Sequence, residues 1–215
     1  MHAPTTTIET VTVVRPLKVL GLLCLLVSLV LLVVCLSTSF WLRSGAFRTG
    51  LFEECTSSDL SGGTLPDGPP AGQCRRARRT RGQQSYSPVY VTVVAALLII
   101  AALLTAASVG GTVLGLASNN ASRKYLYYRI AMYFALLAVL LKLIGLVVFP
   151  VCFYMEMKDW RRPQWEFDWS YGVAWGATLF TFGAALLLIC DKEHEEIYYK
   201  EKTLYHSPDQ KGGVL

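Results

Sequence analysis

The 215-residue sequence has few charged residues and few histidines. Charged side chains make up 16% of the chain, whereas soluble domains usually carry about 25%. The three histidines, His2, His194 and His206, lie in the terminal segments, and the chain has no HExxH, P-loop or GxSxG motif. These absences argue against a metal centre and catalytic chemistry, so we expect a protein that is not an enzyme and uses no cofactor.

Signatures of nucleic-acid binding are also missing. The formal net charge of +5 is modest, and the basic residues are scattered over the non-apolar segments apart from one cluster. No zinc finger, RNA-binding signature or basic helix accompanies them. We therefore expect no nucleic-acid partner.

Acidic residues are absent from four long apolar runs, at about residues 17–40, 89–116, 130–151 and 171–190. A hydrocarbon core of about 30 Å needs roughly 20 helical residues, so each run is long enough to cross a bilayer. Membrane strands are only about 9–11 residues long and alternate in polarity, which these runs do not. A signal peptide, with an apolar region of about 7–15 residues, is disfavoured for the first run. The sequence predicts an all-α membrane protein that crosses the lipid bilayer four times.

The total of Lys and Arg is nearly equal on the two sides of the membrane, so only the basic residues of the short second loop and beside the first run indicate the orientation. The short second loop, residues 117–129, carries Arg123, Lys124 and Arg129 without an acidic residue, and Arg15 and Lys18 flank the first run. Short cytoplasmic loops carry such an excess of positive charge. We therefore expect cytoplasmic segments at 1–16 and 191–215, with extracellular loops at 41–88 and 152–170.

Two cysteines, Cys55 and Cys74, are the only pair within an aqueous loop. A pair of loop thiols suggests a disulfide bond, which persists on the oxidising lumenal or extracellular side of a membrane. This agrees with the orientation derived from the basic residues. Two unrelated free thiols are the alternative.

A pattern of aromatic, glycine and cysteine residues occupies the first loop. In order it contains Trp41, Gly50, Leu51, Phe52, Cys55 and Cys74. This pattern resembles the first-loop signature of the extended claudin and peripheral myelin protein superfamily of four-span proteins, with Phe52 in place of a Trp. Residues 166–178, 15–18 and 148–150 are most similar to its transmembrane protein 47 subgroup. The resemblance covers roughly residues 15–190.

The resemblance implies a left-handed four-helix bundle within residues 17–190, capped by a small extracellular antiparallel β-sheet from loops one and three. Trp41, Gly50, Leu51 and Phe52 would pin this sheet to the mouth of the bundle, and a plain aromatic belt is the alternative. The resemblance also implies a plasma-membrane protein of cell–cell junctions that organises adhesion or junction assembly with junctional or adhesion proteins. An auxiliary subunit of an ion channel or receptor is the alternative function, and a paracellular pore ranks below both.

Small residues recur along two of the runs. Ala107, Gly111 and Gly115 lie at every fourth position, and Gly172 and Gly176 form a GxxxG motif. Such stripes let helix backbones approach closely in lipid. Packing within one bundle is the simpler interpretation, and a homo-oligomer interface is the alternative.

Lys142 is the one charge inside the third run, about 18 Å along a helix from Ile130. A lysine at this depth costs about 2.5–3.5 kcal/mol on insertion scales. Its expected partners are helix-end carbonyls, or Glu156, Glu166 and Asp168 just outside the membrane. A lysine that snorkels outward is the simpler interpretation, and a ligand or ion contact is the functional one.

A basic cluster of five arginines follows the second loop cysteine: Arg75, Arg76, Arg78, Arg79 and Arg81. Such a patch could attract anionic lipid, a glycosaminoglycan or an acidic partner surface. Its sequence also fits a dibasic site for a proprotein convertase. A solvated charge run is the simpler interpretation.

Overall fold

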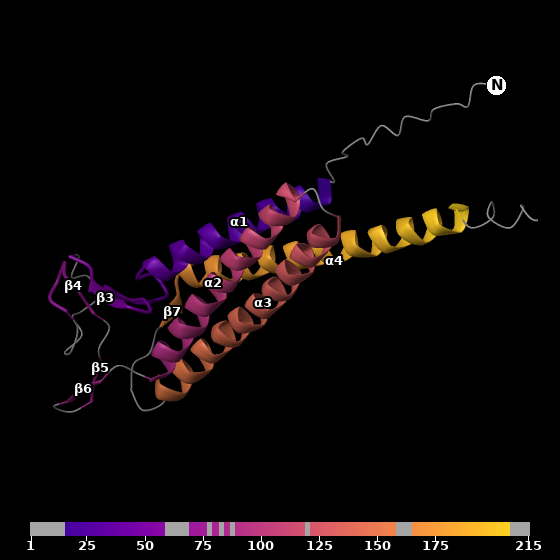
Figure 1. Ribbon diagram of the computed structural model, residues 1–215. Helices are drawn as coiled ribbons and strands as arrows, with labels where there is room; N and C mark the ends of the chain where they lie inside the picture. The colour runs from indigo at the N-terminus through magenta and orange to yellow at the C-terminus, as the bar shows by residue number, and fades with distance from the viewer. Residues whose placement is uncertain are drawn as a thin grey trace, which may run out of the picture.

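The computed structural model describes residues 16–58, 69–76, 79–81, 84–86, 89–118, 121–157 and 165–206. Within these residues, four helices form an elongated bundle with a small sheet at one end (Figure 1). The helices are α1 (Pro16–Ser37), α2 (Val89–Ala117), α3 (Ala121–Met157) and α4 (Trp169–His206). Each contains a segment long and apolar enough to cross a membrane. The predicted four-span membrane architecture is confirmed.

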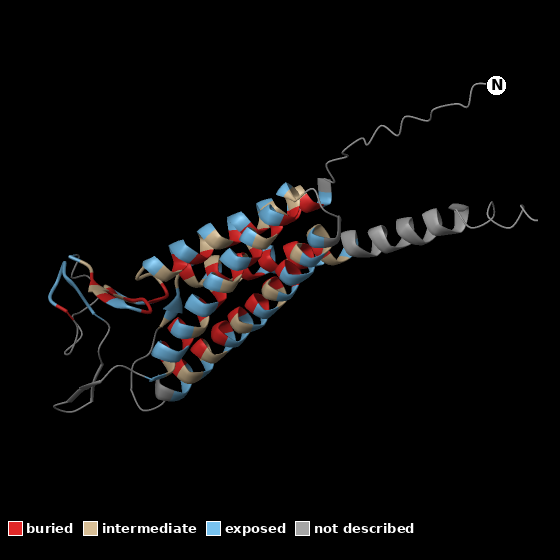
Figure 2. Ribbon diagram, viewed as in Figure 1, coloured by how far each residue is buried: buried red, intermediate tan, exposed pale blue. Residues whose placement is uncertain are grey.

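Each helix turns one stripe of residues toward the bundle axis and presents apolar residues on its outer side (Figure 2). From Val94 to Gly115 the buried positions of α2, apart from Ala95, alternate between steps of four and three, which is the spacing of left-handed helix packing. These positions are Val94, Leu98, Ala101, Thr105, Ser108, Thr112 and Gly115. The exposed Leu, Ile and Val side chains of the outer faces suit a lipid surrounding rather than water.

The bundle consists of two closely packed helix pairs, α1 with α4 and α2 with α3, and the contacts between the pairs are fewer. In the α2/α3 pair, the Ser108 hydroxyl donates to the carbonyl of Ala131 at 2.8 Å. In the α1/α4 pair, the Ser28 hydroxyl donates to the carbonyl of Ala177 at 2.7 Å. A hydroxyl thus ties each pair together without leaving a polar group unpaired in the apolar core.

The first helix is shorter than the predicted span 17–40, because α1 ends at Ser37. The Ser37 hydroxyl donates to the carbonyl of Val34 at 3.0 Å, and the Thr38 hydroxyl donates to that of Cys35 at 3.4 Å. These side chains satisfy carbonyls that the end of the helix leaves without amide donors. Residues 38–40 therefore belong to the connection to the sheet.

The third helix is longer than the predicted span 130–151, and it continues through Pro150 to Met157. Proline lacks the N–H that would bond to the carbonyl of Leu146 four residues earlier. The Tyr171 hydroxyl of α4 donates to this carbonyl at 2.9 Å. A side chain from the neighbouring helix thus replaces the missing backbone donor, so the helix does not have to end at the proline.

The fourth helix begins at Trp169 and continues beyond the predicted limit of residue 190 to His206. The added segment is rich in Glu and Lys, which favour helix in water as well as in contact with other helices. The apolar run therefore marks the part of α4 that spans the membrane but not the end of the helix.

The sheet has the order β4-β3-β2-β1-β7, with every neighbouring pair antiparallel. Its strands are β1 (Leu42–Ser44), β2 (Phe47–Thr49), β3 (Glu53–Thr56), β4 (Cys74–Arg76) and β7 (Glu166–Phe167). The strands β5 (Arg79–Arg81) and β6 (Gln84–Tyr86) form a separate hairpin. Since β7 comes from the loop before α4, the sheet joins loops one and three as predicted.

Candidate functional site

The sheet is anchored to the bundle by Trp41, whose side chain is 0% exposed. Its indole Nε1 donates to the carbonyl of Cys35 at 2.7 Å. Its ring packs edge-on against Phe149 of α3 and Tyr171 of α4, with centroids 5.2 and 6.0 Å away. A residue at the start of the sheet thus contacts three helices, which is closer to the pinned-sheet interpretation than to a plain aromatic belt.

Backbone hydrogen bonds attach the sheet to the start of α4. The amide of Asp168 donates to the carbonyl of Trp41 at 3.1 Å, and the amide of Ser170 donates to that of Phe40 at 3.2 Å. The hydroxyls of Thr38 and Ser170 also bond to each other. Because these bonds join the connection after α1 to the start of α4, the sheet is a continuation of the α1/α4 pair.

Gly50 lies where the β2–β3 turn meets the end of α1. A Cβ atom at this position would lie 2.7 Å from both Cα of Ser39 and the carbonyl oxygen of Thr38, closer than real Cβ contacts. The next residue, Leu51, is buried in the core cluster that contains Trp41. Phe52 instead points outward and is 44% exposed. Of the four residues predicted to pin the sheet, Trp41, Gly50 and Leu51 therefore build the anchor, and Phe52 lies on the surface.

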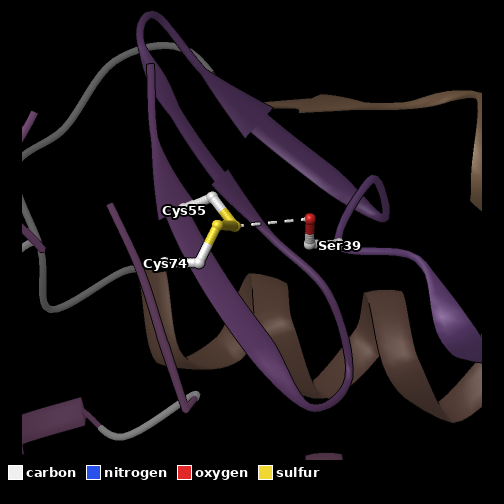
Figure 3. Close-up of a disulfide and its surroundings, with 3 residues drawn as sticks. All are labelled: Ser39, Cys55 and Cys74. Carbon is white, nitrogen blue, oxygen red and sulfur yellow. Dashed lines mark hydrogen bonds between the residues drawn. A yellow bond between two sulfur atoms is a disulfide. The ribbon is translucent and has the colours of Figure 1, made fainter. Parts of the chain in front are cut away.

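The disulfide between Cys55 and Cys74 joins β3 to β4, where the two residues lie directly opposite each other. The Ser39 hydroxyl points at the Cys55 sulfur and donates to it at 3.5 Å (Figure 3). The predicted disulfide bond is confirmed. It holds β4 against β3 and so against the rest of the sheet.

The sheet presents charged residues on the side opposite Leu42, Phe47 and Thr49, which are buried. Arg43 lies opposite Arg48 on one side and Glu166 on the other, and Glu53 lies opposite Arg76. The guanidinium of Arg48 lies 4.9 Å from the centroid of the Phe40 ring, which accommodates its charge beside Arg43. We call Arg43, Glu53, Arg76 and Glu166, all exposed, the charged face.

The basic cluster predicted from the sequence is divided by the structure. Arg75 and Arg76 form part of β4, and Arg75 Nε lies 3.5 Å from the carboxylate of buried Glu54. Arg79 and Arg81 belong to β5 of the separate hairpin. Arg78 lies outside the described residues. The cluster therefore does not extend over one strand, and its first member is paired with an acid.

The two small-residue stripes differ in surroundings. A Cβ at Gly111 would lie 3.2 Å from that of Ala131, and one at Gly115 would lie 2.9 Å from the ring of Tyr128. Both glycines thus let α2 approach α3. Ala107 is exposed, and a Cβ at Gly172 or Gly176 would meet nothing within 4 Å. Only part of the α2 stripe packs within the bundle, and the α4 glycines face outward.

We expect Gly111→Leu to lower the free energy of unfolding by about 1–3 kcal/mol, because overpacking forces α2 away from α3. Gly176→Leu is the matched control, since its site is open, and we expect no change. Thermal unfolding of the purified protein in detergent measures both. An equal loss in both variants would contradict this assignment of the two faces.

Lys142 lies apart from the sheet, inside the bundle and fully buried. Its hydrogen bonds go to Ser28 and Thr181 rather than to helix-end carbonyls or to Glu166 and Asp168. Lys142 therefore neither snorkels outward nor uses the predicted partners, because hydroxyls on α1 and α4 accept its hydrogen bonds inside the bundle. The side chain of Glu156 lies outside the described set.

Several structural partners were not predicted from the sequence. Phe149 and Tyr171 form the aromatic socket of Trp41, and Ser28 and Thr181 accept from Lys142. A signal existed for the hydroxyls, because each is a polar residue well inside an apolar run. No comparable signal marked the aromatic residues, which are ordinary at membrane interfaces.

Among the described residues, no group of three His, Cys, Asp or Glu side chains comes together as a metal site. Residues 17–188 match the PMP-22/EMP/MP20/Claudin family. A relative from Danio rerio, the p53 apoptosis effector related to PMP-22, is 38% identical over 71 residues. That alignment covers 33% of this chain and 37% of the relative. The family match thus includes the first three membrane spans, the disulfide-tied sheet and all but the last two residues of the fourth span.

Proposed function

The chain belongs to the PMP-22/EMP/MP20/Claudin family, and on this premise we propose that it is a non-enzymatic protein of cell–cell junctions that organises adhesion or junction assembly. The observation that carries the proposal is the outer sheet, which is tied by a disulfide and anchored by Trp41. A surface held in place by the bundle meets a partner without having to be ordered first, which reduces the entropic penalty of binding.

The charged face supports a protein partner. It contains two pairs of opposite charge on neighbouring strands, Arg43 beside Glu166 and Arg76 beside Glu53. Complementary charges at an interface select partners and orient them during encounter. A mixed pattern of this kind fits a protein surface with its own mixed charges better than it fits a uniformly anionic surface.

The proposal places the sheet outside the cell and both termini in the cytoplasm. The disulfide favours this orientation, because such bonds persist in oxidising compartments. The basic residues at the opposite end of the bundle, Arg123, Lys124 and Arg129, agree with the positive charge of cytoplasmic loops. The plasma membrane at cell–cell contacts is the proposed location.

The test is to express the tagged full chain in epithelial cells and to grow these cells in one monolayer with cells that do not express it. We expect enrichment at cell borders, and Arg43→Glu combined with Arg76→Glu should lower that enrichment without lowering the amount at the surface. Arg123→Glu, an exposed charge at the other end of the bundle, is the control and should leave enrichment unchanged. A uniform surface distribution, or stoichiometric recovery of an ion channel or receptor on purification, would favour the auxiliary-subunit function instead.

A further inference from the structure

Lys142 is a buried cation in a membrane bundle, with a side chain that is 0% exposed. Its Nζ donates to Ser28 Oγ of α1 at 3.1 Å and to Thr181 Oγ1 of α4 at 2.6 Å. No Asp or Glu occurs in any of the four spans. The charge is therefore stabilised by hydroxyl dipoles and not by an opposite charge.

The two hydroxyls are oriented to accept. Each carries one proton and two lone pairs. The Ser28 hydroxyl donates to the carbonyl of Ala177 at 2.7 Å, and the Thr181 hydroxyl donates to the same carbonyl at 2.9 Å. The two hydroxyl oxygens also lie 2.5 Å apart, so either hydroxyl can donate to the other instead of to the carbonyl. In each of these arrangements both oxygens keep a lone pair that accepts from the ammonium. We call Lys142, Ser28, Thr181 and the Ala177 carbonyl the lysine clasp.

The clasp joins the two helix pairs. Lys142 belongs to the α2/α3 pair, whereas both acceptors and the carbonyl belong to the α1/α4 pair. Contacts between the pairs are otherwise fewer than those within them. A shift of one pair past the other by a single helical turn, about 5.4 Å, would remove both acceptors from the ammonium. An ammonium in hydrocarbon without acceptors is strongly unfavourable.

We propose that the lysine clasp is a register lock, which fixes the position of the α1/α4 pair along the α2/α3 pair. The two helix pairs close stably only in the arrangement that brings Ser28 and Thr181 to Lys142, and every other arrangement leaves a bare ammonium in the membrane. Because the outer sheet continues the α1/α4 pair, the lock also sets the position of the sheet relative to α2 and α3.

The lock predicts an unusual pattern of rescue. Ser28→Ala combined with Thr181→Val removes the acceptors but keeps the charge, and we expect an unfolding midpoint in detergent about 5–10 °C lower. Most of the protein should also fail to reach the cell surface. Lys142→Met keeps both hydroxyls bonded to Ala177, so its midpoint should equal or exceed that of the wild type. The triple variant should return to within about 2 °C of Lys142→Met, because no charge remains to be satisfied.

Thr178→Val is the matched control, because the Thr178 hydroxyl is also buried on α4 and donates to a carbonyl one turn back, that of Ala174 at 2.9 Å. Thr178 has no bond to Lys142, so this variant should stay near the wild type. A Ser28→Ala/Thr181→Val variant as stable as Thr178→Val would overturn the proposal. A triple variant as unstable as that double variant would overturn it as well.

Discussion

Replacing Trp41 by alanine is expected to lower the free energy of unfolding by about 3–5 kcal/mol, the range for truncating a buried aromatic residue. The indole fills a socket between Phe149 and Tyr171, and it is the donor to the Cys35 carbonyl at the end of α1. The substitution removes the packing and leaves that carbonyl without this side-chain donor. Thermal or chemical unfolding in detergent measures the loss.

Two further substitutions test whether the loss of stability is specific to the Trp41 anchor or follows the removal of any aromatic side chain near the sheet. Trp41→Phe keeps most of the packing but removes the indole donor, so we expect a smaller loss of about 1–2 kcal/mol. Trp169→Ala truncates a tryptophan that is 48% exposed at the start of α4, and its effect should be smaller than that of Trp41→Ala. Equal losses for Trp41→Ala and Trp169→Ala would show that Trp41 is not the anchor.

Removing the disulfide by Cys55→Ser combined with Cys74→Ser is expected to destabilise the sheet by about 3 kcal/mol on the chain-entropy model. The two residues are separated by 19 positions, and the bond holds β4 to β3 across that loop. Release of β4 should expose the chain after Arg75 and Arg76 to trypsin. The helices have their own contacts, so helical circular dichroism should change little.

The rate of trypsin cleavage measures this release, and reduction of the wild-type protein should reproduce it. Cys190→Ser is the control, because Cys190 is a free, exposed cysteine on α4. If the double variant resists trypsin as well as the wild type does, then backbone pairing alone holds β4 and the disulfide has no part in maintaining the sheet.

The sequence was sufficient to predict the membrane-spanning helices, because what a span requires lies within its own segment of the chain. A helix in lipid satisfies its backbone within the segment, so an apolar run of sufficient length predicts a span without knowledge of its neighbours. The limits of the helices were less accurate. The end of α1 depended on the hydroxyls of Ser37 and Thr38, and the continuation of α3 through Pro150 depended on Tyr171 from another helix.

The outer sheet was predicted from the resemblance of the first loop to the claudin and peripheral myelin protein superfamily, and not from a strand pattern in the sequence. Each strand has two to four residues in the structure, which is too short for a periodic pattern to be recognised. The family assignment and the disulfide were confirmed, whereas assignment to the transmembrane protein 47 subgroup stays a prediction. The roles of the charged face and of the outward-facing glycines also stay predictions.

The sequence by itself determined the number of spans, the location of the cysteine pair and the presence of one lysine at mid-membrane depth. Only the tertiary structure decided what surrounds that lysine, because Ser28, Lys142 and Thr181 belong to three different helices and meet only when the helix pairs close. The same holds for Trp41, whose socket comes from α3 and α4. Membrane insertion follows from the composition of each segment, whereas the register of the bundle follows from contacts between segments far apart in the chain.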